Sequence, residues 1–362
     1  MMNESERLNE YIRSVYPPNK ALAALAAERE QWLAKPRGTL GRLEDLAIQL
    51  SSIQNRLRPG HENKLMVVCA GDHGVVEEGV SVYSKDVTYQ QIVNFSQGGG
   101  CITVLSQNVG AKVVLLDVGV DHDLPAHPKI VAAKIARGTK NLAKGPAMTR
   151  DEAVASVVTG IETVLAEPQL DLVAAGEMGI GNTTPSSCIA AALAGLTPEE
   201  AAGRGAGLDD RQVRHKAEVI ARSLEINKPD PSDPLDVLAK VGGLEIGAMA
   251  GVYIGGAIRR AGLIIDGFIA AAAAVLAEKL APGVKSYMIA GHKSREKAHG
   301  ALLGYLGLSP LLDLGMWLGE GSGAAVAMFI CQCACEHFNK MKTLAEAAVT
   351  DVIDLDQILN GS

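Results

Sequence analysis

The stretch that decides the fold is Ala111-Lys112-Val113-Val114-Leu115-Leu116-Asp117-Val118, an apolar run that ends in Gly119. An apolar run without alternating polar residues is typical of a strand buried on both faces of a parallel sheet. A second run, at 63–70 (NKLMVVCA), has the same character and leads into Gly71-Asp72-His73-Gly74. The two runs therefore predict two central strands of one sheet.

Further apolar runs at 170–175, 262–266 and 286–290 predict three more strands. Helical patterns separate or follow the five runs at 88–95, 101–109, 150–165, 186–193, 235–240, 245–261, 268–280, 296–306 and 323–339. This alternation predicts an α/β fold: a Rossmann-like, mainly parallel sheet with helices on both faces. The long apolar region 246–275 is interrupted by charged residues at 259, 260 and 266, so we expect buried helix and strand there, not a membrane span.

The region before residue 59 lacks this alternation and shows two helical patterns, at 19–35 and 40–55. We therefore expect three segments. Residues 1–60 contribute helices to a small helical domain, residues 61–325 form a large α/β domain with the active site, and residues 326–362 pack with the small domain.

Composition limits the classes of partner and the cellular setting that fit this chain. Hydrophobic residues make up 48% of the 362 residues, enough for a sizeable core, and the formal charge of −7 disfavours nucleic acid as a partner. The polar N-terminus and the six cysteines, scattered among apolar runs, favour a reduced, cytoplasmic setting without membrane association. Cys331, Cys333 and Cys335 do not share one helix face and have no nearby histidine pair, so we expect no metal site there.

Glycine-rich and polar segments follow the predicted strands, where parallel sheets bind ligands. Gly176-Glu177-Met178-Gly179-Ile180-Gly181-Asn182-Thr183-Thr184-Pro185 opens into a helix, which makes it either an anion cradle or an ordinary capped turn. The glycine loop 203–207 precedes Lys216, whose side chain either binds phosphate or is solvated surface. Asp266 and Ser294 follow two other strands.

Near the C-terminus, Glu320 stands in Leu318-Gly319-Glu320-Gly321-Ser322-Gly323, next to apolar residues at 314 and 316–318. Desolvation there would raise the proton affinity of the carboxylate toward that of a general base. The alternative is that Glu320 caps the helix that follows.

Taken in order along the chain, these and other segments form a set. They are Lys35-Pro36 with Gly38-Thr39-Leu40-Gly41-Arg42-Leu43-Glu44, Asp72-His73-Gly74 with Glu78-Gly79-Val80, Val87-Thr88 with Gln91, Asp117-Val118-Gly119-Val120-Asp121, the segment 176–185, Val241-Gly242-Gly243, Asp266-Gly267-Phe268 and the segment 318–323. The set closely resembles the nicotinate-nucleotide:5,6-dimethylbenzimidazole phosphoribosyltransferases of cobalamin assembly, over roughly residues 20–345.

The resemblance implies transfer of 5-phosphoribosyl from nicotinate mononucleotide to a lower-ligand base, with release of nicotinate and inversion to an α-ribotide. It implies that Glu320 is the general base. It places Tyr83, Gln91 and Leu318 at the acceptor base, and it places six residues at the nucleotide: Glu177, Gly179, Gly205, Lys216, Asp266 and Ser294. No cofactor or metal is implied, and the partners would be the small-molecule substrates and a second subunit in a dimer.

Two positions depart from the family pattern. Trp317 stands where relatives often carry arginine, and Tyr83 is bulkier than the residue in some relatives. These departures leave the acceptor open among dimethylbenzimidazole, another benzimidazole, adenine and a phenol. They also leave open a divergent, weakly active or non-catalytic paralogue that works in a hetero-oligomer. A nicotinamide-dependent oxidoreductase is disfavoured because G-x-G-x-x-G is absent.

Overall fold

The computed structural model describes residues 2–205 and 207–350. Six strands form one sheet: β1 (Lys64–Gly71), β2 (Ala111–Gly119), β3 (Ile130–Ala132), β4 (Leu172–Met178), β5 (Gly262–Ile265) and β6 (Met288–Ala290). Their order is β3-β2-β1-β4-β5-β6, and every neighbouring pair is parallel. The predicted Rossmann-like parallel sheet is thus confirmed. The strand order reverses between β1 and β4, the point at which such sheets open a ligand crevice beyond the carboxyl ends of the strands.

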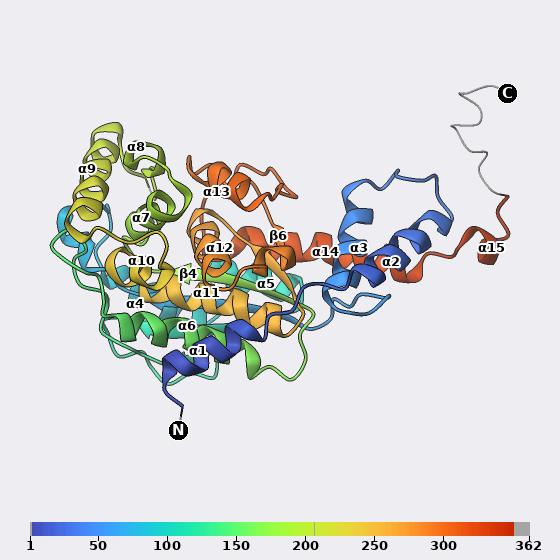
Figure 1. Ribbon diagram of the computed structural model, residues 1–362, viewed down its shortest axis with the longest axis horizontal. Coiled ribbons are helices and arrows are strands. Elements are labelled where there is room, and N and C mark those ends of the chain that lie inside the picture. Colours follow the sequence, from blue (N-terminus) through green and yellow to red (C-terminus); the bar gives the residue numbers. More distant parts are fainter. Residues whose placement is uncertain (1, 206, 351–362) are drawn as a thin grey trace. The chain divides into compact units, whose positions relative to one another are not determined.

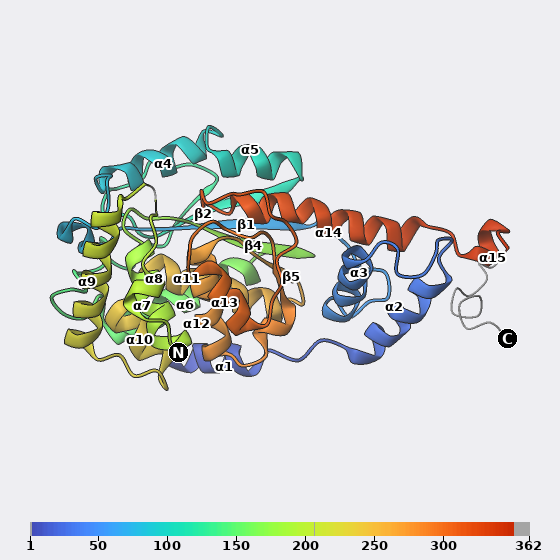
Figure 2. The same ribbon diagram turned by 90° about the horizontal axis from the view of Figure 1, so that it is seen from above.

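Helices cover both faces of the sheet, as Figures 1 and 2 show. On one face α11 (Leu244–Ile258) packs on β1 and β4, and α6 (Arg150–Leu165) packs on α11. On the other face lie α4 (Asp86–Ser96) and α5 (Cys101–Asn108). Small residues let α11 and α6 approach closely, since a Cβ at Gly251 would lie 2.1 Å from the carbonyl oxygen of Val157.

The other helices of this α/β unit surround the carboxyl edge and flanks of the sheet. They are η1 (Gly74–Glu78), α7 (Thr183–Ala194), α8 (Pro198–Ala201), α9 (Asp210–Asn227), α10 (Pro234–Val241), α12 (Phe268–Leu280), η2 (Val284–Tyr287), α13 (His299–Leu306) and the start of α14 (Ser322–Lys340). Neither α9 nor the edge strand β3 was delimited from the sequence. β3 has only three residues, none of them buried, so no apolar run marks it.

The structure divides into two compact units: described residues up to Pro17 with 62–328, and 18–61 with the described residues from Phe329 on. The sequence-based expectation grouped residues 1–60 together. Instead α1 (Glu4–Arg13) belongs to the α/β unit, because it packs along α6 and Tyr11 donates a hydrogen bond to Glu162 at 3.0 Å.

The second unit contains α2 (Lys20–Trp32), α3 (Arg42–Ile53), the remainder of α14 and α15 (Leu344–Ala347). A buried ion network holds it together: Lys35 Nζ lies 3.0 Å from a Glu30 oxygen and 2.7 Å from a Glu44 oxygen. His337 Nε2 lies 3.2 Å from the same Glu30 oxygen. The segment from Lys35 to Glu44 therefore stabilises this helical unit.

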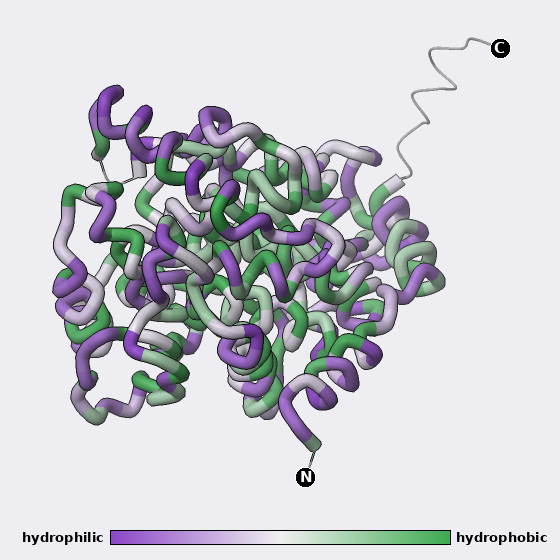
Figure 3. The backbone as a smooth tube through the Cα atoms, turned by 60° about the vertical axis from the view of Figure 1, so that its left-hand side comes forward, coloured by the Kyte–Doolittle hydropathy of each residue, from purple (hydrophilic) through white to green (hydrophobic). Residues whose placement is uncertain are grey.

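Hydrophobic segments gather in the interior and hydrophilic segments at the periphery (Figure 3). The apolar region 246–275 forms α11, β5 and part of α12. Within the described part of the chain, no helix combines the length and the apolar character needed to cross a membrane.

Candidate active site

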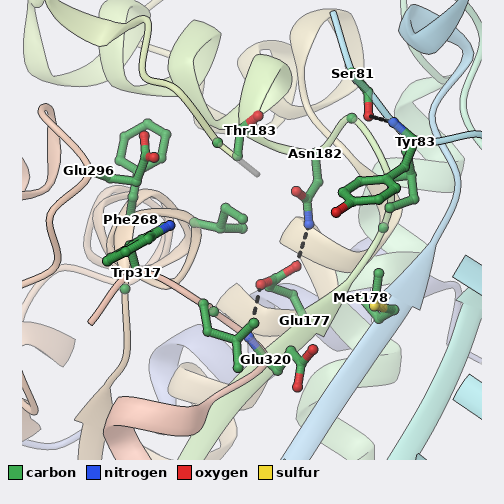
Figure 4. Close-up of a pocket in the computed structure, with 18 of the residues that line it drawn as sticks. Ser81, Tyr83, Glu177, Met178, Asn182, Thr183, Phe268, Glu296, Trp317 and Glu320 are labelled. Atoms are coloured by element: carbon green, nitrogen blue, oxygen red, sulfur yellow. Dashed lines mark hydrogen bonds between the residues drawn. The ribbon is translucent and has the colours of Figure 1, made fainter. Parts of the chain in front are cut away.

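A cavity of about 440 Å³ opens at the carboxyl edge of the sheet. Its walls come from the segments after β1, β4, β5 and β6, from the loop before α9, and from the residues before α14. The structure brings all ten sequence-predicted site residues to this cavity: Tyr83, Gln91, Glu177, Gly179, Gly205, Lys216, Asp266, Ser294, Leu318 and Glu320. Residues from distant parts of the chain thus share one space, part of which is drawn in Figure 4.

Glu320 has an unusual main chain. Its φ is +63°, between Gly319 at +86° and Gly321 at +94°. The left-handed region is costly for a residue with a side chain, and such strain tends to persist at functional sites. A Cβ at Gly176 of β4 would lie 2.0 Å from the carbonyl oxygen of Glu320, so only glycine at position 176 lets the strand approach this turn.

The carboxylate of Glu320 is poised between its two protonation states. Burial raises its pKa to about 7, opposed by a hydrogen bond from the Ile102 N–H and reinforced by the charge of Asp266. Its Oε2 atom is buried and has no hydrogen-bond partner among the described residues. A carboxylate with a pKa near neutrality and a free oxygen is suited to accept a proton from a ligand.

Glu177 lies beside Glu320, as Figure 4 shows. Its Oε1 accepts the backbone N–H of Glu320 at 3.1 Å, and its Oε2 accepts a hydrogen bond from the Asn182 amide. Burial raises the pKa of Glu177 to about 8, and the charges of Glu320 and Asp266 add to this effect.

Asp266 has the helix-capping role that the alternative interpretation of the sequence gave to Glu320. Its two oxygens accept the N–H groups of Gly321, at 3.1 Å, and Ala324, at 2.9 Å, and so cap α14. Burial raises the pKa of Asp266, while the nearby ring of His292, with Nδ1 3.8 Å from Oδ1, lowers it. Since Asp266 serves as the cap, the alternative that Glu320 caps this helix is wrong.

Glu177, Asp266 and Glu320, here called the acid cluster, place three carboxyl groups at one part of the cavity. Burial raises the pKa of all three groups, and for Glu177 and Glu320 the charges of neighbouring carboxylates add to this effect. When a cation binds, the cluster would ionise further and stabilise the positive charge. A member that is already ionised can accept a proton.

Lys216 supplies a buried cation to the same cavity. Its side chain is 0% exposed and its Nζ donates to the Thr183 hydroxyl at 2.6 Å. Burial lowers its pKa to about 8, partly offset by the charge of Glu296. The alternative of a solvated surface lysine is therefore wrong. A buried ammonium beside a hydroxyl needs an anion to complete its surroundings.

The remaining wall is apolar and more open. Tyr83, Trp317 and Leu318 are 48%, 51% and 55% exposed and line the cavity. The guanidinium carbon of Arg295 lies 4.4 Å from the centre of the Trp317 ring. Such a wall suits a planar aromatic ligand.

The lining residues that were not predicted as binding residues from the sequence include Asn182, Arg204, Phe268 and Glu296. Each follows a strand or lies in a glycine loop, which is the signal that could have marked it. Asp72 and His73, which follow β1, instead make structural contacts near the site. Asp72 accepts the N–H of Asp121 at 2.8 Å, and His73 pairs with the buried Glu245 at 2.8 Å.

Comparison with known proteins gives a consistent result. A family model described as phosphoribosyltransferase matches residues 15–349. A relative from Desulforudis audaxviator (strain MP104C) is 50% identical over 345 residues, which cover 95% of this chain and 98% of the relative. One from Chloroflexus aggregans (strain MD-66 / DSM 9485) is 47% identical over 346 residues, with coverage of 95% and 98%. Both relatives bear the name nicotinate-nucleotide–dimethylbenzimidazole phosphoribosyltransferase.

Among solved structures, CobT from Thermus thermophilus superimposes with a TM-score of 0.88 at 43% identity. The match covers 92% of this chain and 100% of the CobT chain. The similarity therefore extends over sequence, fold and nearly the full length.

Proposed function

Because the chain belongs to the phosphoribosyltransferase family, we propose that it transfers 5-phosphoribosyl from nicotinate mononucleotide to a lower-ligand base. The products would be nicotinate and an α-ribotide for the nucleotide loop of a cobamide. The observation that carries the proposal is that the acid cluster and the buried Lys216 line one cavity. The names of the two relatives support the choice of donor and of acceptor class.

The donor's phosphate would bind beside Lys216. Thr183 and Ser294 offer hydroxyl groups there, and Gly205 brings its backbone close, since a Cβ at Gly205 would lie 3.9 Å from the Lys216 Nζ. An anchored phosphate fixes the ribose relative to the acid cluster. Positioning of this kind lowers the entropy cost of the transfer step.

The transfer step would then need negative charge near the ribosyl C1 and a base that accepts the proton of the acceptor. As the bond from the ribosyl C1 to the nicotinate nitrogen breaks, its electron pair goes to the pyridine ring and C1 becomes cationic. Glu177 and Asp266 would stabilise that charge. The acceptor nitrogen attacks C1 from the opposite face, and its proton passes to Glu320, whose pKa is about 7.

The acceptor would lie against the apolar wall. Tyr83, Gln91, Trp317 and Leu318 would contact a planar ring, with Gln91 on α4 offering an amide for hydrogen bonding. Dimethylbenzimidazole, another benzimidazole, adenine and a phenol all meet this description, so the panel of acceptors has to be tested directly.

The test is turnover by the purified chain alone with nicotinate mononucleotide and each acceptor. Release of nicotinate together with an α-ribotide, identified by chromatography and mass spectrometry, would support the proposal. A chain that binds the nucleotide but turns over none of the acceptors would instead be the non-catalytic member of a hetero-oligomer.

We also propose that the chain works as a dimer, as its family resemblance implies. Light scattering at micromolar concentration tests this, and a monomer would contradict it. Turnover by the purified chain alone would favour two identical subunits, whereas turnover only after a paralogue is added would favour a mixed dimer.

A further inference from the structure

Glu296 is an acid that the proposed transfer does not use, although it lies at the anion-binding part of the cavity. It lines the cavity with Lys216, Gly205 and Ser294, and Figure 4 shows it on the same side as Phe268 and Trp317. Its Oε2 lies so close to Gly203 that a Cβ there would be 1.8 Å away. Its carboxylate also accepts a hydrogen bond from the N–H of Gly205. Glu296 therefore uses a backbone donor that a phosphate oxygen would need.

Lys216 has too few partners for a buried cation. Its Nζ bonds to the Thr183 hydroxyl, and among the described residues it forms no ion pair. The acid whose charge acts on it is Glu296. Glu296 thus lines the same cavity as the buried cation without forming an ion pair with it, so Lys216 has no close anionic partner in the described part of the chain while the Glu296 carboxylate stays at the Gly205 N–H.

Other charged groups surround Glu296, and most are already engaged. Arg204 pairs with Asp210, Arg295 stacks on Trp317, and the Lys297 Nζ donates to the Glu199 carbonyl at 3.1 Å. The charged residues that line the adjoining cavity with Glu296 are Glu199, Arg204, Asp210, Arg214, Arg295 and Lys297. Among these charged groups Lys216 is fully buried, so solvent screens its interaction with Glu296 the least.

We propose that Glu296 is a placeholder for the donor's phosphate, meaning that its carboxylate occupies the anion site in the ligand-free protein. Phosphate binding displaces this carboxylate and adds a proton to it. This inference rests on the proposed function, because it assumes that a phosphate binds at Lys216. The phosphate takes the Gly205 N–H, and the displaced carboxylate, now beside a dianion, takes a proton from solvent. The O–H bond of the protonated Glu296 is the one covalent bond that forms, and no bond of the nucleotide breaks.

The pH dependence follows from these charges. Burial raises the pKa of Glu296 in the empty site, while Lys216 and the Gly205 N–H lower it in part. Loss of that hydrogen bond and repulsion by the phosphate raise the pKa further in the complex. Between the two pKa values the complex holds one proton more than the free protein, so phosphate affinity falls as pH rises through this window.

The experiment is calorimetry of inorganic phosphate and of nicotinate mononucleotide binding, in pairs of buffers with different ionisation enthalpies. Lys216 and the phosphate also titrate near neutrality, so the wild type is compared with Glu296→Gln, which keeps the shape and an acceptor oxygen. We expect the variant to bind about tenfold tighter at pH 8, the equivalent of one pKa unit, and to take up fewer protons. Glu199→Gln removes a charge from the adjoining cavity and should leave both quantities unchanged.

Weaker binding by Glu296→Gln, or unchanged proton uptake, would overturn the placeholder and point to a carboxylate that binds the ribose or only supports the loop. Failure of the wild type to bind either phosphate or nucleotide would overturn the anion site, and both proposals with it. A crystal structure of the wild type with inorganic phosphate tests the same idea without a variant. The Glu296 carboxylate should have left the Gly205 N–H, and its retention there beside bound phosphate contradicts the proposal.

Discussion

The backbone N–H of Glu320 donates a hydrogen bond to the carboxylate of Glu177 over 3.1 Å, joining two acids that lie 143 positions apart in the chain. The bond uses the main chain of Glu320 and leaves its carboxylate available. Asp266 caps α14 with both of its oxygens. The three acids are therefore held differently: Glu177 by two donors, Asp266 by a helix end, and Glu320 with one oxygen free.

The cap predicts a stability effect at Asp266. Asp266→Ala leaves the N–H groups of Gly321 and Ala324 without their acceptors and should lower the free energy of unfolding by about 1–3 kcal/mol. Urea denaturation measures this. Asp266→Asn keeps one acceptor oxygen and should lose less, and equal stability of the alanine variant and the wild type would contradict the capping role.

The raised pKa values predict how stability depends on pH. An acid whose pKa is higher in the folded state holds more protons when folded, so its contribution is favourable at low pH and is lost as pH rises. For Glu177 and Glu320, with pKa values of about 8 and about 7, the melting temperature of the ligand-free protein should fall between about pH 5 and about pH 8.

Glu177→Gln should flatten this decline, because the amide cannot ionise. Thermal melting of both proteins across the pH range provides the comparison. A decline of equal slope in wild type and variant would show that Glu177 is not the group responsible. Lys216 adds a pH dependence only above this range: between about 8 and the ordinary lysine value of 10.5 the buried cation loses its proton in the folded state first, so stability should rise with pH there.

The anion site is tested at Lys216. Lys216→Met keeps the length of the side chain and removes the charge, so KM for nicotinate mononucleotide should rise about tenfold or more, from the loss of a charge-assisted contact. Stability should hold or rise, because a buried unpaired cation is replaced by an apolar group. Lys297→Met, at the exposed edge of the adjoining cavity, is the matched control, and an unchanged KM in Lys216→Met would rule out the phosphate contact.

Trp317 tests the acceptor wall. Trp317→Arg replaces the exposed indole of the acceptor wall with a charged side chain, and it should shift the relative kcat/KM between a benzimidazole and a phenol by about tenfold. KM for the donor should not change, because the phosphate binds near Lys216. Competition assays with paired acceptors measure the shift. If the preference stays the same, Trp317 does not contact the acceptor.

Much of the fold was predictable, because parallel strands buried on both faces leave long apolar runs. β2 shows this at 111–119, where six consecutive residues are buried, and α6 begins and ends at the predicted residues. β3 left no such run. The membership of α1 was also not predictable, because its packing on α6 rests on tertiary contacts that a polar N-terminal sequence does not reveal.

The site was predictable as a set of residues, because strand ends and glycine turns collect at one edge of a parallel sheet. Their individual surroundings were not. The capping of α14 by Asp266 depends on a tertiary contact: the end of β5 lies next to the start of α14, which is over 50 residues later in the chain. The burial of Lys216 was readable in principle: with Ile220, Ser223 and Asn227 it forms a buried helical stripe at spacings of three and four.

Glu320→Gln separates a general base from a glutamate that only supports the glycine turn. The amide keeps the volume of the side chain but cannot accept the proton, so kcat should fall on the order of 10²–10⁴-fold while KM for nicotinate mononucleotide stays near the wild-type value. In the wild type, kcat/KM for the acceptor should rise with pH and level off above about 7, the pKa of Glu320, and the variant should lack this step. Turnover near the wild-type rate, with the pH step retained, would show that Glu320 is not the general base.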